Sequence, residues 1–153
     1  METSQKATNI RVKIVNDGAQ PLPAYETIDA AGMDVRANLK EPLTLAPLGR
    51  ALIPTGLRVQ LPPGLQIEMR PRSGLALKKG ITLVNTPGTI DADYRGEIGV
   101  ILINLSDTPF VVNPGERICQ MVVTPYIQIQ WDKVDTLDKT ERGDGGFGHT
   151  GVK

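Results

Sequence analysis

The last residues of this 153-residue chain carry its strongest chemical signal. Residues 142–151 read RGDGGFGHTG and place Arg142 and Phe147 among five glycines. Glycine loses more backbone freedom on ordering than any other residue, so we expect this segment to stay mobile until a ligand binds it. An arginine suits a phosphate group, and a flat aromatic ring suits a nucleobase. The segment therefore predicts a nucleotide-binding tail, and the alternative is a disordered low-complexity terminus.

A second candidate site is the run PRSGLA, which spans residues 71–76. Ser73 stands where a helix N-cap is expected, and Gly80 follows the helix-forming run LALKK as a stop signal. The free N–H groups of a helix start attract anions, Gly74 lets a ligand approach the backbone, and Arg72 adds a charged fork. The run predicts a phosphate site, and an ordinary Ser-capped helix is the alternative.

The polar segment 85–97, NTPGTIDADYRGE, lies between two apolar runs and predicts a hairpin. Asp91, Asp93 and Tyr94 gather at its tip. One carboxylate there is suited to orient and deprotonate a water molecule, while the tyrosine packs against a sugar. Aspartate is also frequent in turns because its side chain caps nearby amides. A purely structural role for either aspartate is therefore the alternative.

Two polar residues interrupt stretches that otherwise predict strands. Asp34 lies within AGMDVRA, where aspartate is disfavoured, so its charge needs a neighbouring arginine or a hydrated divalent cation. Gln120 ends the run GERICQ, and its amide needs hydrogen bonds from adjacent backbone or from a ligand. Both residues are thus candidates for ligand contact.

Short strands must position these groups. The chain holds 16 glycines and 12 prolines, spread between β-branched stretches, which favours strands over helices. Nearly continuous apolar runs at 98–103 and 118–123 predict strands covered on both faces. Alternating runs predict half-buried strands at 10–14, 57–61, 65–69 and 127–131. The length allows one domain, which we divide into a β-rich body (1–131), a polar tether (132–141) and a glycine-rich lid (142–153).

Composition excludes several functions. Lys plus Arg and Asp plus Glu number 17 each, so whole-molecule attraction to nucleic acid or to an anionic membrane has no basis. One cysteine, Cys119, excludes an internal disulfide, and with one histidine, His149, it cannot make a zinc site, so a metal would take oxygen ligands. No apolar run approaches about 20 residues, and the N-terminus lacks a hydrophobic signal region. We expect a cytoplasmic protein that binds no nucleic acid or membrane.

Together, in order and at similar spacing, the five segments resemble the five motifs of the trimeric deoxyuridine triphosphate nucleotidohydrolases, the dUTPases. The match runs from about residue 31 to residue 151. It implies an all-β, jelly-roll-like domain with one short helix and a flexible C-terminal arm, assembled as a homotrimer. Each active site would combine the segments around Asp34, Ser73 and Gln120 of one subunit with the Asp91 hairpin of a second and the arm of a third. Residues 132–141 can extend up to about 33 Å, enough to reach a neighbour.

The resemblance implies a Mg²⁺-dependent hydrolysis of dUTP to dUMP and pyrophosphate, which limits uracil incorporation into DNA and supplies dUMP for thymidylate synthesis. Asp91 would activate the water that attacks the α-phosphorus. A carboxylate is a feeble base at neutral pH, so most of the acceleration would come from charge neutralisation and in-line positioning. Mg²⁺ would bridge the phosphates while its waters touch Asp34.

At the pyrimidine end, the resemblance implies that uracil lies against the backbone of Gly88, Thr89 and Ile90 and against the Asn85 amide, with no room for a thymine methyl. Tyr94 beneath the deoxyribose would exclude a 2′-hydroxyl, and Gly99 would border the pocket through its backbone. The phosphates and the closing lid would use the remaining implied residues, Arg72, Ser73, Gly74, Gln120, Arg142, Phe147 and Gly148.

Two residues depart from the family pattern. Cys119 stands where alanine is common, and we expect it to be a small buried hydrophobe. His149 stands where serine is frequent, and it either contacts the γ-phosphate when protonated or is simply solvated. Two other functions fit the same fold: a dCTP deaminase, which would release ammonia from dCTP, and a catalytically silent trimer, which would release no pyrophosphate from dUTP.

Overall fold

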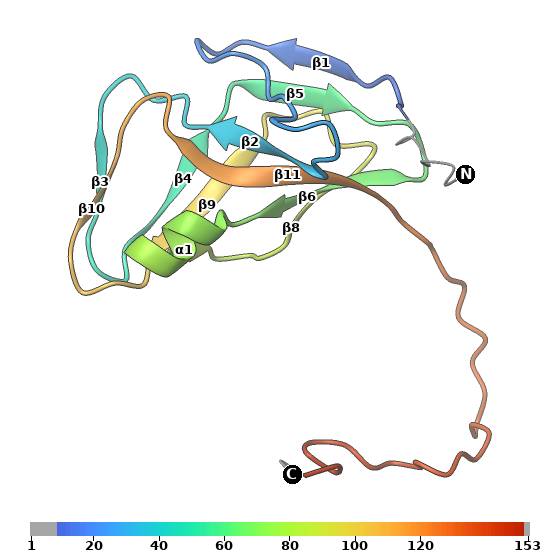
Figure 1. Ribbon diagram of the computed structural model, residues 1–153. Helices are drawn as coiled ribbons and strands as arrows, with labels where there is room; N and C mark the ends of the chain where they lie inside the picture. Colours follow the sequence, from blue (N-terminus) through green and yellow to red (C-terminus); the bar gives the residue numbers. More distant parts are fainter. Residues whose placement is uncertain (1–8, 152–153) are drawn as a thin grey trace, which may run out of the picture.

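The computed structural model describes residues 9–151, which form eleven strands and one short helix (Figure 1). These elements confirm the prediction of an all-β fold with a single short helix. The elements are β1 (Lys13–Asn16), β2 (Gly32–Arg36), β3 (Leu43–Leu45), β4 (Arg50–Pro54), β5 (Leu57–Gln60), β6 (Leu65–Arg70), α1 (Ser73–Lys79), β7 (Ile81–Leu83), β8 (Gly88–Ile90), β9 (Gly99–Asn104), β10 (Phe110–Val112) and β11 (Arg117–Pro125).

The strands pair in a nested order. β2 pairs with β11, β3 with β10 and β4 with β9, all antiparallel. Nested antiparallel pairs of this kind make up a jelly roll, as the resemblance to the dUTPase motifs implied. The result is a four-stranded sheet β2-β11-β6-β8, a three-stranded sheet β4-β9-β7 and two strand pairs, β1-β5 and β10-β3.

One hydrophobic core joins the two larger sheets. Met69 and Met121 enter it from the four-stranded sheet, and Val100 and Leu102 enter it from the three-stranded sheet. The apolar run at 98–103 predicted a strand covered on both faces. In β9 fully buried residues alternate with half-buried ones, so only one face of the strand is completely covered. This alternation follows from the two-residue period of a strand.

Two predicted strands differ from the structure. Residues 127–131 are irregular, and Ile127 and Trp131 are 92% and 89% exposed, so the strand prediction is wrong there. The alternating pattern is present, but β11 ends at Pro125. No strand within residues 9–151 pairs with residues 127–131, so their backbone groups form no sheet hydrogen bonds there. At the other end, β1 begins at Lys13 and is exposed throughout, since it pairs with β5 alone.

The predicted helix exists, with one correction at its start. Its N-cap is Arg72, in an extended conformation, and Ser73 is the first helical residue rather than the cap. The Arg72 side chain is held by contacts across the sheet, which keep this residue out of the helix. At the other end Gly80 adopts the left-handed conformation, with φ 65°, and donates to the Ala76 carbonyl, as its stop signal predicted.

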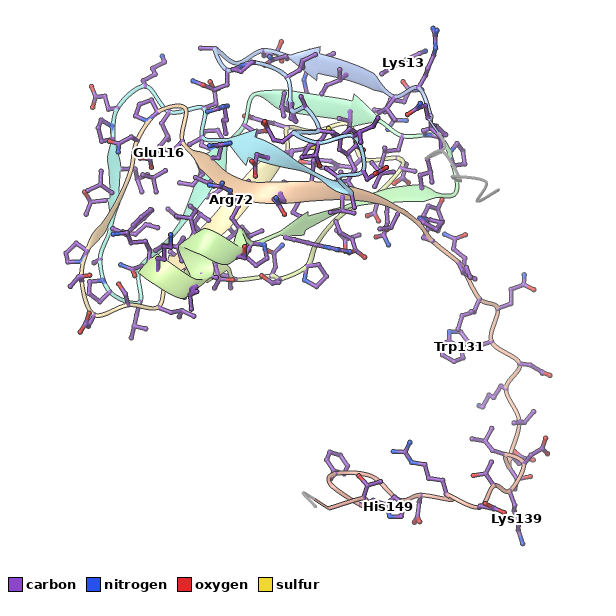
Figure 2. All side chains as sticks on the ribbon, viewed as in Figure 1. Lys13, Arg72, Glu116, Trp131, Lys139 and His149 are labelled. Carbon is purple, nitrogen blue, oxygen red and sulfur yellow. The ribbon has the colours of Figure 1, made fainter. Side chains whose placement is uncertain are left out.

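After Pro125 the chain leaves the β body as an irregular arm (Figure 1). A hydrogen bond from Tyr126 N to Gly64 O, 3.0 Å long, ties its base to the body. Farther along, Trp131 and His149 lie away from the body's side chains (Figure 2). None of the helices in the described part of the chain is long and apolar enough to cross a membrane.

Candidate active site

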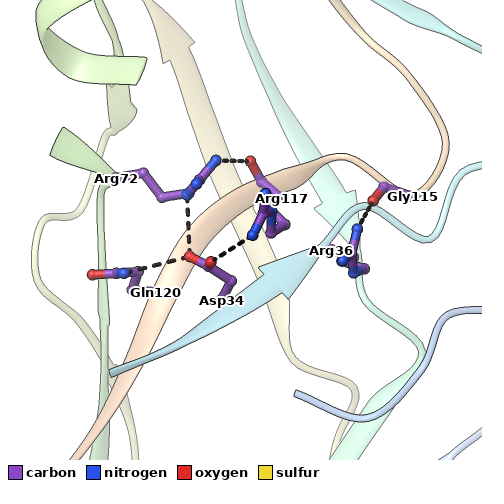
Figure 3. A network of polar contacts seen from close by, with 6 residues as sticks. All are labelled: Asp34, Arg36, Arg72, Gly115, Arg117 and Gln120. Carbon is purple, nitrogen blue, oxygen red and sulfur yellow. Dashed lines mark hydrogen bonds and ion pairs between the residues drawn. The ribbon is translucent and has the colours of Figure 1, made fainter. Parts of the chain in front are cut away.

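The carboxylate of Asp34 lies at the centre of a polar cluster (Figure 3). Its side chain is only 11% exposed. Oδ1 lies 3.1 Å from Nε of Arg72 and accepts a hydrogen bond from Nε2 of Gln120 at 3.4 Å. Oδ2 lies 3.5 Å from a guanidinium nitrogen of Arg117. Two arginines thus lie beside the Asp34 charge, and the partner of the Gln120 amide is this carboxylate.

A β-bulge brings two of these donors to the same side of the sheet. Arg117 and Gln120 are three positions apart, so in a regular strand their side chains would point to opposite faces. In β11, however, Arg117 lies opposite Arg36 and Gln120 lies opposite Asp34, with a register shift between them. The extra residue of the bulge turns both side chains toward Asp34. Sequence reasoning missed Arg117, because no local pattern reveals a bulge.

The helix start next to this cluster is open. No side chain caps α1, so its first N–H groups have no acceptor within the helix. Ser73 and Gly74 are exposed, and a Cβ added at Gly74 would meet no atom within 4 Å. Arg72 also donates to the Arg117 carbonyl at 3.1 Å, which fixes its guanidinium beside the helix start. The geometry offers N–H groups and positive charge to an anion.

A separate cavity of about 290 Å³ lies beside the hairpin that follows β8. It brings together five of the predicted residues, Thr89, Ile90, Asp91, Tyr94 and Gly99. Sequence reasoning missed its other lining residues, Leu52, Glu97 and Ile101. Leu52 comes from β4, and only the pairing of β4 with β9 places it here.

Hydrogen bonds within the hairpin hold its tip in place. The Tyr94 hydroxyl donates to the Glu97 carbonyl at 2.9 Å, and Tyr94 N donates to the Asp91 carbonyl at 3.2 Å. Gly96 lies directly beneath the Tyr94 ring, where any Cβ would collide with the phenol. Asp91 is exposed and lines the cavity, so its carboxylate can accept a hydrogen bond from a water molecule.

Asn85 and Gly88 lie just before this cavity. Gly88 is buried, and a Cβ there would lie 3.2 Å from both the Asn85 amide nitrogen and Cβ of Met69. Glycine at this position thus lets the Asn85 side chain approach the backbone of β8. The Asn85 amide and the β8 backbone together offer donors and acceptors suited to a pyrimidine edge.

The two halves of the predicted site lie apart within one chain. β8 runs antiparallel to β6 with Ile90 opposite Ile67, so Asp91 lies beside the first half of β6. Ser73 follows the other end of β6, beyond Arg70. A strand rises about 3.3 Å per residue, so the steps from Ile67 to Arg70 alone cover roughly 10 Å. One chain alone does not bring the carboxylate to the helix start.

The arm residues are also separate from both halves. Arg142 donates through Nε to the Gly145 carbonyl within the arm, at 2.9 Å. Phe147 is fully exposed, and Gly148 follows it with φ 86°. The structure therefore does not bring Arg142, Phe147 or Gly148 to the other predicted residues.

Cys119 is fully buried in β11 beside the polar cluster. Burial raises the pKa of its thiol from 9.0 to about 12; the nearby Asp34 charge adds to this rise, and the Arg72 charge opposes it. The thiol is neutral at physiological pH, as expected for a small buried hydrophobe.

Magnesium fits this site as an ion carried by a phosphate ligand. Residues 9–151 contain no group of three or more His, Cys, Asp or Glu side chains that could hold a metal. Mg²⁺ commonly keeps several waters and binds through few carboxylates and through phosphates. Asp34, already paired with two arginines, suits hydrogen bonding to such waters better than direct coordination.

Comparison with known proteins identifies the family of this chain. The family model for dUTPase matches residues 18–151, nearly all of the described chain. The chain belongs to the dUTPase family. Among curated members of the family, it is 55% identical to a deoxyuridine 5′-triphosphate nucleotidohydrolase of Fusobacterium nucleatum over 142 residues, which cover 93% of this chain and 97% of that protein. It is 52% identical to the Finegoldia magna protein of the same name, with 93% and 99% covered.

Solved dUTPase structures share the fold. The dUTPase of Staphylococcus bacteriophage 80alpha with dUpNHpp superposes with a TM-score of 0.84 at 24% identity and covers 94% of this chain and 100% of that one. A mutant dUTPase from phage phi11 of S. aureus superposes with a TM-score of 0.76 at 20% identity, over 85% of this chain and 100% of that one. At these identities the likeness concerns the fold of the dUTPase family alone.

Proposed function

We propose that this member of the dUTPase family is a dUTP diphosphatase that hydrolyses dUTP to dUMP and pyrophosphate. The observation that carries the proposal is the hairpin cavity, because it combines a space of about 290 Å³, a backbone edge and an exposed carboxylate. Curated relatives more than half identical bear the name deoxyuridine 5′-triphosphate nucleotidohydrolase. The product dUMP would serve thymidylate synthesis in the cytoplasm, and removal of dUTP would limit uracil incorporation into DNA.

The pyrimidine would bind in the hairpin cavity. Asn85 and the backbone of residues 88–90 supply hydrogen-bonding groups to its polar edge. The Tyr94 ring, fixed by its bond to the Glu97 carbonyl, would pack beneath the deoxyribose and leave no space for a 2′-hydroxyl. Gly99 would contribute only backbone to the wall.

The phosphates would bind at the helix start. Ser73 and Gly74 offer free N–H groups, and Arg72 adds a charge already oriented by Asp34. Gln120 would turn its amide from Asp34 to the α-phosphate. When bound with the triphosphate, Mg²⁺ would neutralise phosphate charge, and Asp34 is the residue that would hold its waters.

Asp91 would orient the attacking water and take its proton. Since a carboxylate is a weak base, positioning and charge neutralisation supply most of the rate acceleration. The water would attack the α-phosphorus in line with the departing pyrophosphate. This requires Asp91 to lie beside the phosphates, which the separation of the two halves within one chain prevents.

A homotrimer removes this difficulty. A second subunit would place its Asp91 hairpin against the helix start of the first, and the separation along β6 supports such sharing. The arm of a third subunit would then close the site, with Phe147 over the base and with Arg142 and the Gly148 N–H at the outer phosphates. Closure would remove water from the phosphates. The arm's exposed side chains and its distance from the body support this role.

The test is hydrolysis of dUTP, dTTP, dCTP and UTP side by side in oxygen-isotope-labelled water, with and without Mg²⁺. We expect pyrophosphate from dUTP only, dependent on Mg²⁺, with the label in dUMP because attack is on the α-phosphorus. Label in pyrophosphate would refute the position of attack. Ammonia from dCTP would replace the proposal with a deaminase, and no reaction with any nucleotide would leave a binding protein.

A further inference from the structure

We infer that the Leu52 side chain forms the apolar wall of the pyrimidine cavity at the place where Gly99 has no side chain, and so limits the size of the group at C5 that the site accepts. The inference rests on the proposed function, because it assumes that the cavity binds the base. It adds a specificity residue from a strand outside the segments that resemble the family motifs.

Strand register places Leu52 and Gly99 on the same face. In the β4–β9 pair, Leu52 lies opposite Ile101 and Pro54 lies opposite Gly99. Residues two positions apart point to the same side of a strand, so Leu52 and Gly99 are diagonal neighbours on the outward face of the sheet. A long side chain reaches such a neighbour.

Leu52 fills the space that a side chain at position 99 would take. A Cβ built on Gly99 would lie 2.5 Å from Cδ1 of Leu52 and 3.3 Å from its Cγ. The isobutyl group therefore lies directly over the Gly99 backbone. It is 67% exposed even though it is large and apolar, and it borders the cavity.

The chemistry of the cavity assigns this wall to the apolar edge of the base. In the proposed complex, Asn85 and the backbone of β8 would serve the polar edge, and Tyr94, fixed by its bond to the Glu97 carbonyl, would lie beneath the sugar. The C5–C6 edge of a pyrimidine carries no hydrogen-bonding group, so it requires an apolar surface. Leu52 and Ile101 are the apolar side chains that the three-stranded sheet contributes to the lining.

The test uses three variants of the full chain: Leu52→Ala, Gly99→Ala and the double variant. kcat/KM is measured for dUTP and dTTP. Removal of the wall in Leu52→Ala should raise dTTP use relative to dUTP by about tenfold or more, the effect typical of one carbon in an apolar pocket. In Gly99→Ala the new methyl should push the isobutyl group into the cavity and raise KM for dUTP about tenfold. The double variant should recover dUTP use, because the collision is gone.

Controls separate this inference from simpler outcomes. Leu105→Ala truncates a leucine that is 57% exposed outside the cavity and should leave the dUTP to dTTP ratio unchanged. Leu52→Val makes a smaller truncation and should give a smaller change in the same ratio and direction. This variant keeps the test valid if Leu52→Ala fails to fold. An unchanged ratio in both Leu52 variants overturns the inference, as does an equal loss on both substrates together with loss of assembly in sedimentation. An inactive parent chain refutes the proposed function instead.

Discussion

Replacement of Asp34 by asparagine tests how the polar cluster is held together. The amide removes the negative charge between Arg72 and Arg117 and keeps the side-chain shape. Hydrogen bonds to charged groups contribute about 1.5–3 kcal/mol when buried. Here one contact is short, at 3.1 Å, and two are long, at 3.4 and 3.5 Å. The arginines are 30% and 42% exposed, so solvent screens part of the effect. We expect a loss of about 1–2 kcal/mol in the free energy of unfolding.

Asp17→Asn is the matched control. Asp17 pairs with Arg58 at 2.7 Å, a shorter contact than any at Asp34, but the two side chains are 62% and 46% exposed. An exposed ion pair contributes about 0.2–1 kcal/mol, so this variant should lose at most about half of what Asp34→Asn loses. Distance alone would predict the opposite order. The comparison thus tests burial against contact length.

Urea unfolding at fixed protein concentration measures both variants, since assembly makes apparent stability depend on concentration. For the same variants without urea, kcat/KM for dUTP should fall at least about tenfold in Asp34→Asn, because Arg72 loses the contact that orients it. Asp17→Asn should keep full activity. Equal loss of stability in the two variants would refute the burial argument. Unchanged turnover in Asp34→Asn would refute a role of the Asp34 cluster in phosphate binding.

Other predictions follow from the same structure. Asp91→Asn should bind dUTP normally in calorimetry yet turn it over about 10³-fold more slowly; near-normal turnover would remove Asp91 from the mechanism. Deletion of residues 142–153 should abolish most of kcat/KM, because the site no longer closes over the substrate, while sedimentation shows an unchanged assembly. A smaller assembly would show that the arm acts in association instead. Burial raises the pKa of the Cys119 thiol from 9.0 to about 12, so the unfolded thiol ionises first as pH rises. Stability should therefore fall above pH 9 by up to about 1.4 kcal/mol per pH unit. Urea unfolding of Cys119→Ala across pH 7–11 should lack this thiol-dependent loss, and parallel curves for the two proteins would contradict it.

Local patterns were sufficient for most of the β elements. The alternation at 57–61 and 65–69 corresponds to β5 and β6, because a two-residue period directly encodes which face is buried. The glycine at position 80 ended the helix as predicted, since the left-handed conformation there favours glycine. The same kind of pattern failed at 127–131, because an alternating segment becomes a strand only when another strand lies beside it.

The start of the helix shows where local reasoning ends. Serine is a good N-cap, so the local sequence favours Ser73 as the cap. The cap is Arg72, because its side chain is held in contact with Asp34 and with the Arg117 carbonyl, residues distant in the chain. A contact across the sheet thus overrode a local preference.

The amino-acid sequence was sufficient to select the candidate residues, because side-chain types and short spacings are local properties. It identified the acidic hairpin, the helix-start glycine and the arm of the dUTPase family. Which of these groups lie close together depends on the packing of the whole chain. The bulge that turns Arg117 toward Asp34, the approach of Leu52 to Gly99 and the separation of Asp91 from the helix start all depend on strand register. Register is set by the packing of distant segments into one core, and no short stretch of sequence contains that information.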